Sequence, residues 1–202
     1  MTGHPVRLAI LVFLALMATG CFRAARSLLL PADLAQPVES GRWRVIGRTT
    51  PDDYARLAPD ARSQCTAFGG SMYCPRSIQQ ITRNRDGSYT TYAIGQPEQA
   101  KALRLSSMGD NLYVFEAVRT AGAPEVEYSV AQYIHSGGVP MFSIHVPNCS
   151  DLPWLHDLAA PRPAMESVCD VPSRRNLIQL MGRLRRNLPD PDSPTFFYIR
   201  MR

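Results

Sequence analysis

The five cysteines are the residues of this 202-residue chain whose type and spacing point most directly to chemistry. Apart from Cys21 they form an even set, Cys65, Cys74, Cys149 and Cys169, and an even set in an exported chain favours two disulfides. Four cysteines allow three pairings. We expect Cys65–Cys74, because two adjacent glycines can reverse the chain between them. We expect Cys149–Cys169, because that bridge would staple an irregular segment rich in proline.

Metal binding and catalysis have little support in the sequence. It contains no C-x-x-C, G-x-S-x-G or H-E-x-x-H motif and no phosphate-binding loop. In a hairpin that turns at Gly137-Gly138, His135 falls near Pro140 and His145 near Val130, too far apart to share an ion. We therefore expect no metal and no cofactor, and a non-catalytic protein rather than an enzyme.

The N-terminus carries the features of an export signal. Arg7 precedes the apolar stretch "LAILVFLALMATGC", which ends at Cys21. A helix of thirteen residues reaches only about 20 Å, whereas a bilayer core is ~30 Å thick. The stretch is therefore short for a membrane span and has the organisation of a signal peptide. A cleaved secretory signal without lipid and an uncleaved anchor are the alternatives.

The residues around the end of that stretch, Thr19, Gly20 and Cys21, resemble the lipobox of bacterial lipoproteins. The resemblance implies cleavage before Cys21 and attachment of lipid, such as palmitate, to its sulfur. In that family an aspartate after the cysteine favours retention at the inner membrane. Phe22 stands there in this chain, so the resemblance implies a lipid anchor at the outer membrane, with the protein facing the periplasm.

Composition and texture divide the chain into three parts. Residues 1–20 are expected to be the signal peptide, residues 21–40 a lipid-anchored tether, and residues 41–202 a single β-rich domain. The formal net charge of the whole chain is +5. This excess is too small to indicate nucleic acid as a partner, and no basic-aromatic motif of the RNA-binding type is present.

The local patterns predict strands, hairpin turns and two helices. Thr50 can cap a short helix that has Pro51 at its first position. The other expected elements are a strand over 42–47, hairpins turning at 86–87, 109–111 and 137–138, a helix over 173–188 and a final strand over 195–201. The fold class is therefore α+β and β-rich: an antiparallel meander sheet or partly closed barrel with a C-terminal helix and final strand.

The helix expected over 173–188 has two faces. Ser173 can cap it, and its apolar stripe consists of Leu177, Leu180, Met181, Leu184 and Leu188. The stripe predicts packing on the sheet. The basic residues of the helix are either solvated or directed at anionic lipid headgroups beside the anchor. They are Arg174, Arg175, Arg183, Arg185 and Arg186.

Trp43 is the residue that suggests a ligand. The tripeptide Gly41-Arg42-Trp43 opens the first strand of the domain, and such a G-x-W opening resembles lipocalins and related calycins. Those proteins are antiparallel barrels in which a tryptophan closes one end, and they carry small apolar ligands. The order of meandering strands, a late helix and a last strand is similar. The resemblance implies a cavity beside Trp43.

Three functions therefore remain open. The first is a lipid-anchored envelope protein that acts as a non-catalytic binding or assembly factor for another envelope protein. The second is a calycin-like carrier of a small apolar ligand. The third is an envelope hydrolase whose site is not recognisable from sequence. A cavity, an exposed apolar patch or a cleft with a perturbed histidine or carboxylate would separate these functions.

The lipobox resemblance makes a direct prediction. The variant Cys21→Ala should block lipidation and leave an unprocessed precursor, because the cysteine sulfur is the atom that carries the lipid. Mass spectrometry of the wild-type N-terminus should show an acylated Cys21. An unmodified N-terminus that begins at another residue would contradict the lipoprotein interpretation.

Overall fold

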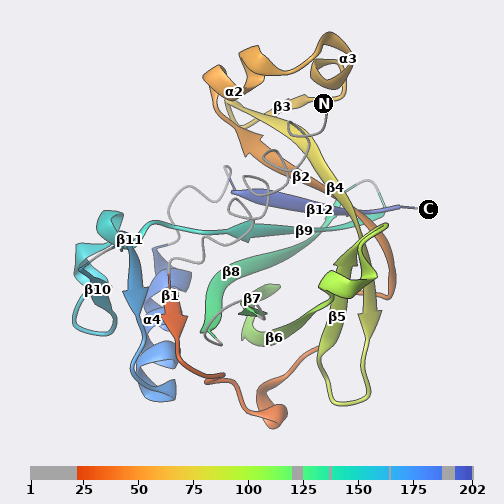
Figure 1. Cartoon of the computed structure of the whole chain (residues 1–202). Coiled ribbons are helices and arrows are strands. Elements are labelled where there is room, and N and C mark those ends of the chain that lie inside the picture. Colours follow the sequence, from red (N-terminus) through yellow and green to blue (C-terminus); the bar gives the residue numbers. More distant parts are fainter. Residues whose placement is uncertain (1–21, 120–124, 137, 164, 188–193, 202) are drawn as a thin grey trace, which may run out of the picture.

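The computed structural model describes the chain except residues 1–21, 120–124, 137, 164, 188–193 and 202 (Figure 1). Among the described residues, no helix is both long and apolar enough to cross a membrane. The architecture is that of the predicted class: a β-rich fold with one main helix near the C-terminus and a final strand.

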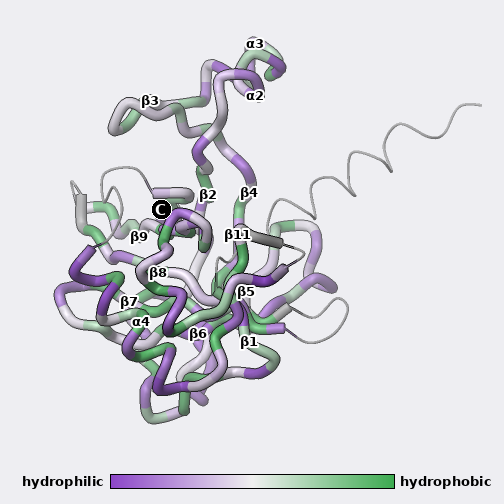
Figure 2. Tube along the Cα trace, turned by 90° about the vertical axis from the view of Figure 1, so that its left-hand side faces the viewer, coloured by the Kyte–Doolittle hydropathy of each residue, from purple (hydrophilic) through white to green (hydrophobic). Residues whose placement is uncertain are grey.

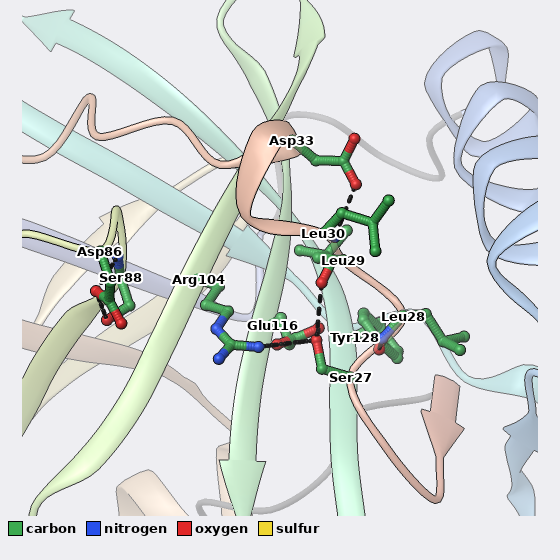
Figure 3. Close-up of polar contacts among 10 residues, drawn as sticks. All are labelled: Ser27, Leu28, Leu29, Leu30, Asp33, Asp86, Ser88, Arg104, Glu116 and Tyr128. Atoms are coloured by element: carbon green, nitrogen blue, oxygen red, sulfur yellow. Dashed lines mark hydrogen bonds and ion pairs between the residues drawn. The ribbon is translucent and has the colours of Figure 1, made fainter.

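Eight antiparallel strands close into a barrel. In order around the barrel they are β2 (Gly41–Thr49), β4 (Ser71–Arg83), β5 (Tyr89–Ala93), β6 (Lys101–Gly109), β7 (Leu112–Arg119), β8 (Glu125–Ser136), β9 (Val139–His145) and β12 (Phe196–Arg200). Consecutive strands in this order follow one another in sequence, apart from inserted segments, and the last strand, β12, pairs with the first, β2. The barrel is therefore an up-and-down meander. The strand pairs of the three predicted hairpins are present, although Gly137 of the third turn lies outside the described residues. At the first turn the Asp86 carboxylate accepts hydrogen bonds from Ser88 (Figure 3).

The strand register gives the stagger of the barrel. Gly41 of β2 aligns through β4 and β5 with Lys101 of β6. In the other direction, Gly47 of β2 aligns through β12, β9, β8 and β7 with Ser107 of β6. The alignments differ by six residues on each strand, and the two strands run in opposite directions, so the stagger is twelve residues. Such steeply tilted eight-stranded barrels have room for side chains or one small ligand.

Strand β8 belongs to two parts of the sheet. Its second half, from Val130 onward, pairs with β9 and closes the barrel. Its first half pairs instead with β1 (Phe22–Ala24), which continues the sheet outward. β11 (Met165–Asp170) pairs in parallel with β1, and β10 (Ala160–Arg162) pairs with β11. This extension lies to one side of the barrel (Figure 1).

Helix α4 (Arg174–Arg186) covers the outer wall of the barrel beside that extension. Ser173 caps it as predicted, accepting a hydrogen bond from the Asn176 backbone. Four residues of the predicted apolar stripe, Leu177, Leu180, Met181 and Leu184, are fully buried; Leu188 lies outside the described residues. They pack on outward-facing residues of β8 and on two short 3-10 helices, η3 (Cys149–Asp151) and η4 (Pro153–Leu155).

A lobe projects from the barrel where β2 ends and β4 begins (Figures 1 and 2). It contains α2 (Pro51–Arg56), α3 (Pro59–Arg62) and the short strand β3 (Thr66–Phe68), which forms a hairpin with the start of β4. Thr50 caps α2 as predicted. The lobe inserts into the meander between its first two strands without interrupting their pairing.

Both predicted disulfides are confirmed. Cys65–Cys74 ties the lobe to β4, with 4.2 Å between the Cα atoms. Cys149–Cys169 joins η3 to β11, with 5.6 Å between the Cα atoms. The second bridge fixes the irregular segment after β9 against the sheet extension, as expected from its sequence.

The segment expected to be a tether instead packs on the domain at several points of its described part, residues 22–40. Phe22 belongs to β1 and is buried, as are Leu29 and Val38. From β1 the chain runs along the outer wall of the barrel, through the 3-10 helix η1 (Pro31–Asp33), to the start of β2. The local pattern could not reveal this, because the contacts join residues about one hundred positions apart.

A buried carboxylate holds this segment to the barrel (Figure 3). Glu116 of β7 has no exposed surface. Its oxygens lie 2.8 and 2.9 Å from the Ser27 hydroxyl, and Arg104 of β6 forms an ion pair with it at 3.3 Å. The backbone N–H of Leu28 donates to the Tyr128 hydroxyl at 2.7 Å. Three barrel strands and the N-terminal segment therefore meet at one polar cluster.

The variant Ser27→Ala should lower the free energy of unfolding by about 1–2 kcal/mol, because Glu116 loses a hydrogen-bond donor in a position that water does not reach. Urea denaturation measures the change. Ser150→Ala is the matched control, since that serine is exposed and bonds only to its neighbour. A change at Ser27 no larger than that of the control would contradict the proposed importance of the cluster.

Candidate ligand-binding site in the barrel interior

The end of the barrel at which β2 begins is filled by large apolar side chains. Trp43 and Ile81 have almost no exposed surface there, and Tyr89 and Phe142 are similarly buried. The indole of Trp43 lies edge-on to the Phe142 ring, with 5.5 Å between ring centroids. These residues form one interior cluster, which is separate from the cluster beneath α4.

The chain that enters β2 seals this closed end from outside. Val38 packs into the interior cluster, and its backbone N–H donates to the Tyr89 hydroxyl at 3.0 Å. The Trp43 indole N–H donates to the Glu39 carbonyl at 3.1 Å. Arg200, the last residue of β12, donates to the Ser40 carbonyl and forms an ion pair with Glu39. Trp43 therefore closes one end, as the calycin resemblance implies, and has no surface left for a ligand.

From Trp43 towards the opposite end of the barrel, the inward-facing residues become shorter and more polar. Strand alternation places the following residues on the inner wall: Ser77, Gln79, Thr91, Ala93, Lys101, Ala117, Ser129 and Phe196. We call this set the far half of the interior. Several of its members are short, and Ala93, Ala117 and Phe196 keep part of their surface accessible although they face inward. The far half therefore keeps accessible surface that the closed end lacks.

Tyr198 lies at the boundary between the two halves. Its ring stacks on Phe142, with 4.5 Å between centroids and 13° between ring planes. Burial raises the pKa of Tyr198 to about 12, and desolvation is the cause. Its side chain nevertheless keeps accessible surface, and within the described part of the chain its hydroxyl has no hydrogen-bond partner. A hydroxyl that has no protein partner and keeps accessible surface can form a hydrogen bond with a ligand or with water.

A short polar ladder lines the interior on the two strands β4 and β5. The Thr91 hydroxyl donates to the Gln79 side-chain oxygen at 3.3 Å, and the Gln79 amide donates to the Ser77 hydroxyl at 3.1 Å. These groups satisfy one another and still offer further acceptor positions. The interior thus combines aromatic surface with a few fixed polar groups, which is the usual composition of a small-molecule site.

The arginines of α4 lie on the outer wall, away from this interior. Arg174 pairs with Asp33, Arg183 with Asp157 and Arg185 with Asp110. The remaining two, Arg175 and Arg186, are exposed. Three of the five arginines suggested for a membrane surface therefore neutralise aspartates of the protein itself.

One group of three side chains has the composition of a metal site, within the ranges that the structure describes. The Cys149 and Cys169 sulfurs and a ring nitrogen of His156 lie within 4.8 Å of one another. The two sulfurs are joined to each other in the disulfide, so they are not available as thiolate ligands. This cluster is best explained as the packing of His156 on the bridge.

Sequence reasoning missed Tyr198. The alternation of Phe196, Tyr198 and Arg200 in the last strand was a usable signal, since all three then share one face. The local pattern does not reveal which face of β12 points into the barrel, because this depends on the pairing of β12 with both β2 and β9.

Comparison with known proteins gave no match: no family model, curated protein or solved structure is similar to this chain. The interpretation of the interior therefore rests on its own residues and geometry.

The raised pKa of Tyr198 predicts an alkaline effect on stability. Because its pKa is raised in the folded state, the unfolded chain ionises first, and stability falls as pH rises from 10 towards 12. Tyr198→Phe should make this fall shallower and leave stability at neutral pH unchanged or higher. Urea denaturation at several pH values tests this, with Tyr54→Phe in the projecting lobe as control. Equal pH dependence in wild type and Tyr198→Phe would contradict the placement of the hydroxyl.

Proposed function

We propose that this protein binds and carries a small, mostly apolar ligand in the far half of the barrel interior, without catalysis. The observation that carries the proposal is Tyr198: its ring stacks on Phe142 within the barrel and keeps accessible surface, and its hydroxyl has no partner in the described chain. A ligand with one polar group would complete this hydrogen bond and cover the accessible aromatic and alanine surface around it.

The closed end supports the same proposal. Trp43 and the segment around Val38 block that end, so a ligand would enter from the end at which β2 and β4 continue into the projecting lobe. Because the closed end is tightly packed and the far half is partly accessible, a ligand could enter the far half without unfolding of the barrel strands. The lipobox resemblance would add a location to this proposal, because a lipid anchor would hold the carrier on the periplasmic side of the outer membrane.

An assembly factor would need a continuous apolar patch for its protein partner. The large apolar side chains that are exposed, in the part of the chain that is described, are Leu30, Phe68, Ile78, Ile94, Trp154 and Ile178. They are spread over different elements, and of these only Ile78 and Ile94 are joined by a backbone hydrogen bond. Carriage of a ligand therefore has the stronger support.

A hydrolase would need a reachable nucleophile. The Ser143 hydroxyl lies 3.2 Å from the His145 ring nitrogen, which is the spacing of a catalytic pair. However, Ser143 and His145 are 1% and 4% exposed, and alternation places them on the outer side of the wall. A substrate cannot reach this pair without opening the packing, so we assign it a structural role.

The neutral fluorescent probe N-phenylnaphthylamine tests the proposed function. We expect saturable binding by the wild type and a loss of at least about tenfold in affinity for Ala117→Trp, because the added indole occupies the far half. Ala102→Trp is the matched control, since Ala102 lies on the neighbouring strand, faces outward and is similarly half-buried.

Circular dichroism and urea denaturation should show that both variants fold. Absence of binding by the wild type would contradict the proposal. Equal loss of binding in the inward and outward variants would contradict the placement of the ligand inside the barrel.

A further inference from the structure

The charges of the far half suggest the chemistry of the ligand. Lys101, the only lysine of the chain, opens β6 two residues before Leu103, which belongs to the interior cluster. By strand alternation its side chain starts on the inner face, one position further from the closed end. No carboxylate of the described residues lies within ion-pair distance of its ammonium group, and the residue is half-buried. Glu98, in the preceding 3-10 helix η2 (Pro97–Gln99), is exposed and forms no ion pair with Lys101.

Arg76 provides a second cation at the same end. A Cβ added at Gly47 would lie 3.0 Å from the Arg76 Nε atom and 3.1 Å from the Phe196 ring, so the arginine stem lies on the inner side of β2 beside Phe196. Its Nη2 atom donates to the Arg48 carbonyl and the Thr49 hydroxyl. These neutral partners fix the guanidinium and leave its charge uncompensated among the described residues, with further N–H groups free to donate.

Two acids of β8 share the inward-facing positions, and both already have basic partners. Glu127 pairs with Arg23 at 3.1 Å, and both side chains are more than nine-tenths buried. Glu125 pairs with Arg23 and Arg162. Among the described residues, the inner wall of the far half therefore has two cations without an acidic partner, Lys101 and Arg76.

We infer that the ligand is an amphipathic anion, with an apolar chain in the barrel and a carboxylate or phosphate group held by Lys101, while Arg76 adds positive charge at the same end of the barrel. This inference rests on the proposed function and specifies its ligand class. A charge-assisted hydrogen bond to the head group would fix the depth of the ligand, and the apolar chain would extend towards Tyr198. Partial exposure of the two cations leaves them accessible from solvent, so the anion keeps some hydration as it binds.

Displacement of N-phenylnaphthylamine by ligands that share one tail length tests the inference. The probes are lauric acid, dodecyl phosphate, dodecanol and dodecylamine, all below their micelle concentrations. We expect the wild type to bind at least one of the anions about tenfold more tightly than dodecanol and dodecylamine least tightly. Added salt should reduce the advantage of the anion. The two anions separate a carboxylate from a phosphate head group.

Two variants connect that preference to the structure. Lys101→Met should lower the affinity for the preferred anion to that for dodecanol and leave dodecanol binding unchanged, and Lys101→Arg should restore it. Arg44→Met is the matched control, because Arg44 lies on the outer face of the barrel and is exposed. Its affinity for every probe should equal that of the wild type.

The outcomes separate the two claims. Failure of all four ligands and of the fluorescent probe to bind would contradict the proposed function. Binding of dodecanol as tight as that of both anions, or an anion preference that survives Lys101→Met, would overturn the inference and leave the carrier function standing.

Discussion

The double pairing of β8 is the constraint on which the rest of the structure depends. Its first half holds β1 and, through β1, the sheet extension with β11 and β10. Its second half holds β9 and thereby closes the barrel. If β9 continued along the whole of β8, Phe22 would lose its place in the sheet. If β1 instead paired along the whole of β8, β9 could not pair there and the barrel would remain open. The change of partner near Ser129 therefore creates a closed interior and a covered outer wall from one strand.

Strand alternation then gives the barrel wall two apolar faces. Val126, Tyr128 and Val130 point outward and are covered by α4 and the segment after β9. Ala131 points inward and joins the cluster around Trp43. Since the outer core is stabilised by the helix, a disulfide and the Glu116 cluster, the inner face need not be filled completely for the protein to fold. The side chains of the far half of the interior can therefore keep accessible surface in the folded protein.

The sequence predicted those features of the fold that depend on residues close together in the chain. The hairpins, the Thr50 and Ser173 caps and the stripe on α4 follow from local period and turn chemistry, and the cysteine pairs followed from the segments they bracket. It could not predict the pairing of Phe22 with Cys169, the docking of Ser27 on Glu116 or the inward face of Tyr198. Each of these depends on strands that are distant in sequence, and local periodicity carries no information about such partners.

The central claim is that a ligand enters the barrel and contacts its inner wall. Methyl NMR spectra of alanine-labelled protein, recorded during titration with N-phenylnaphthylamine, test it most directly. The structure predicts saturable shifts at Ala93 and Ala117, which face the far half, and none at Ala102, which faces outward. Shifts confined to Ala102 and other outer methyl groups, with Ala93 and Ala117 unchanged, would contradict the account.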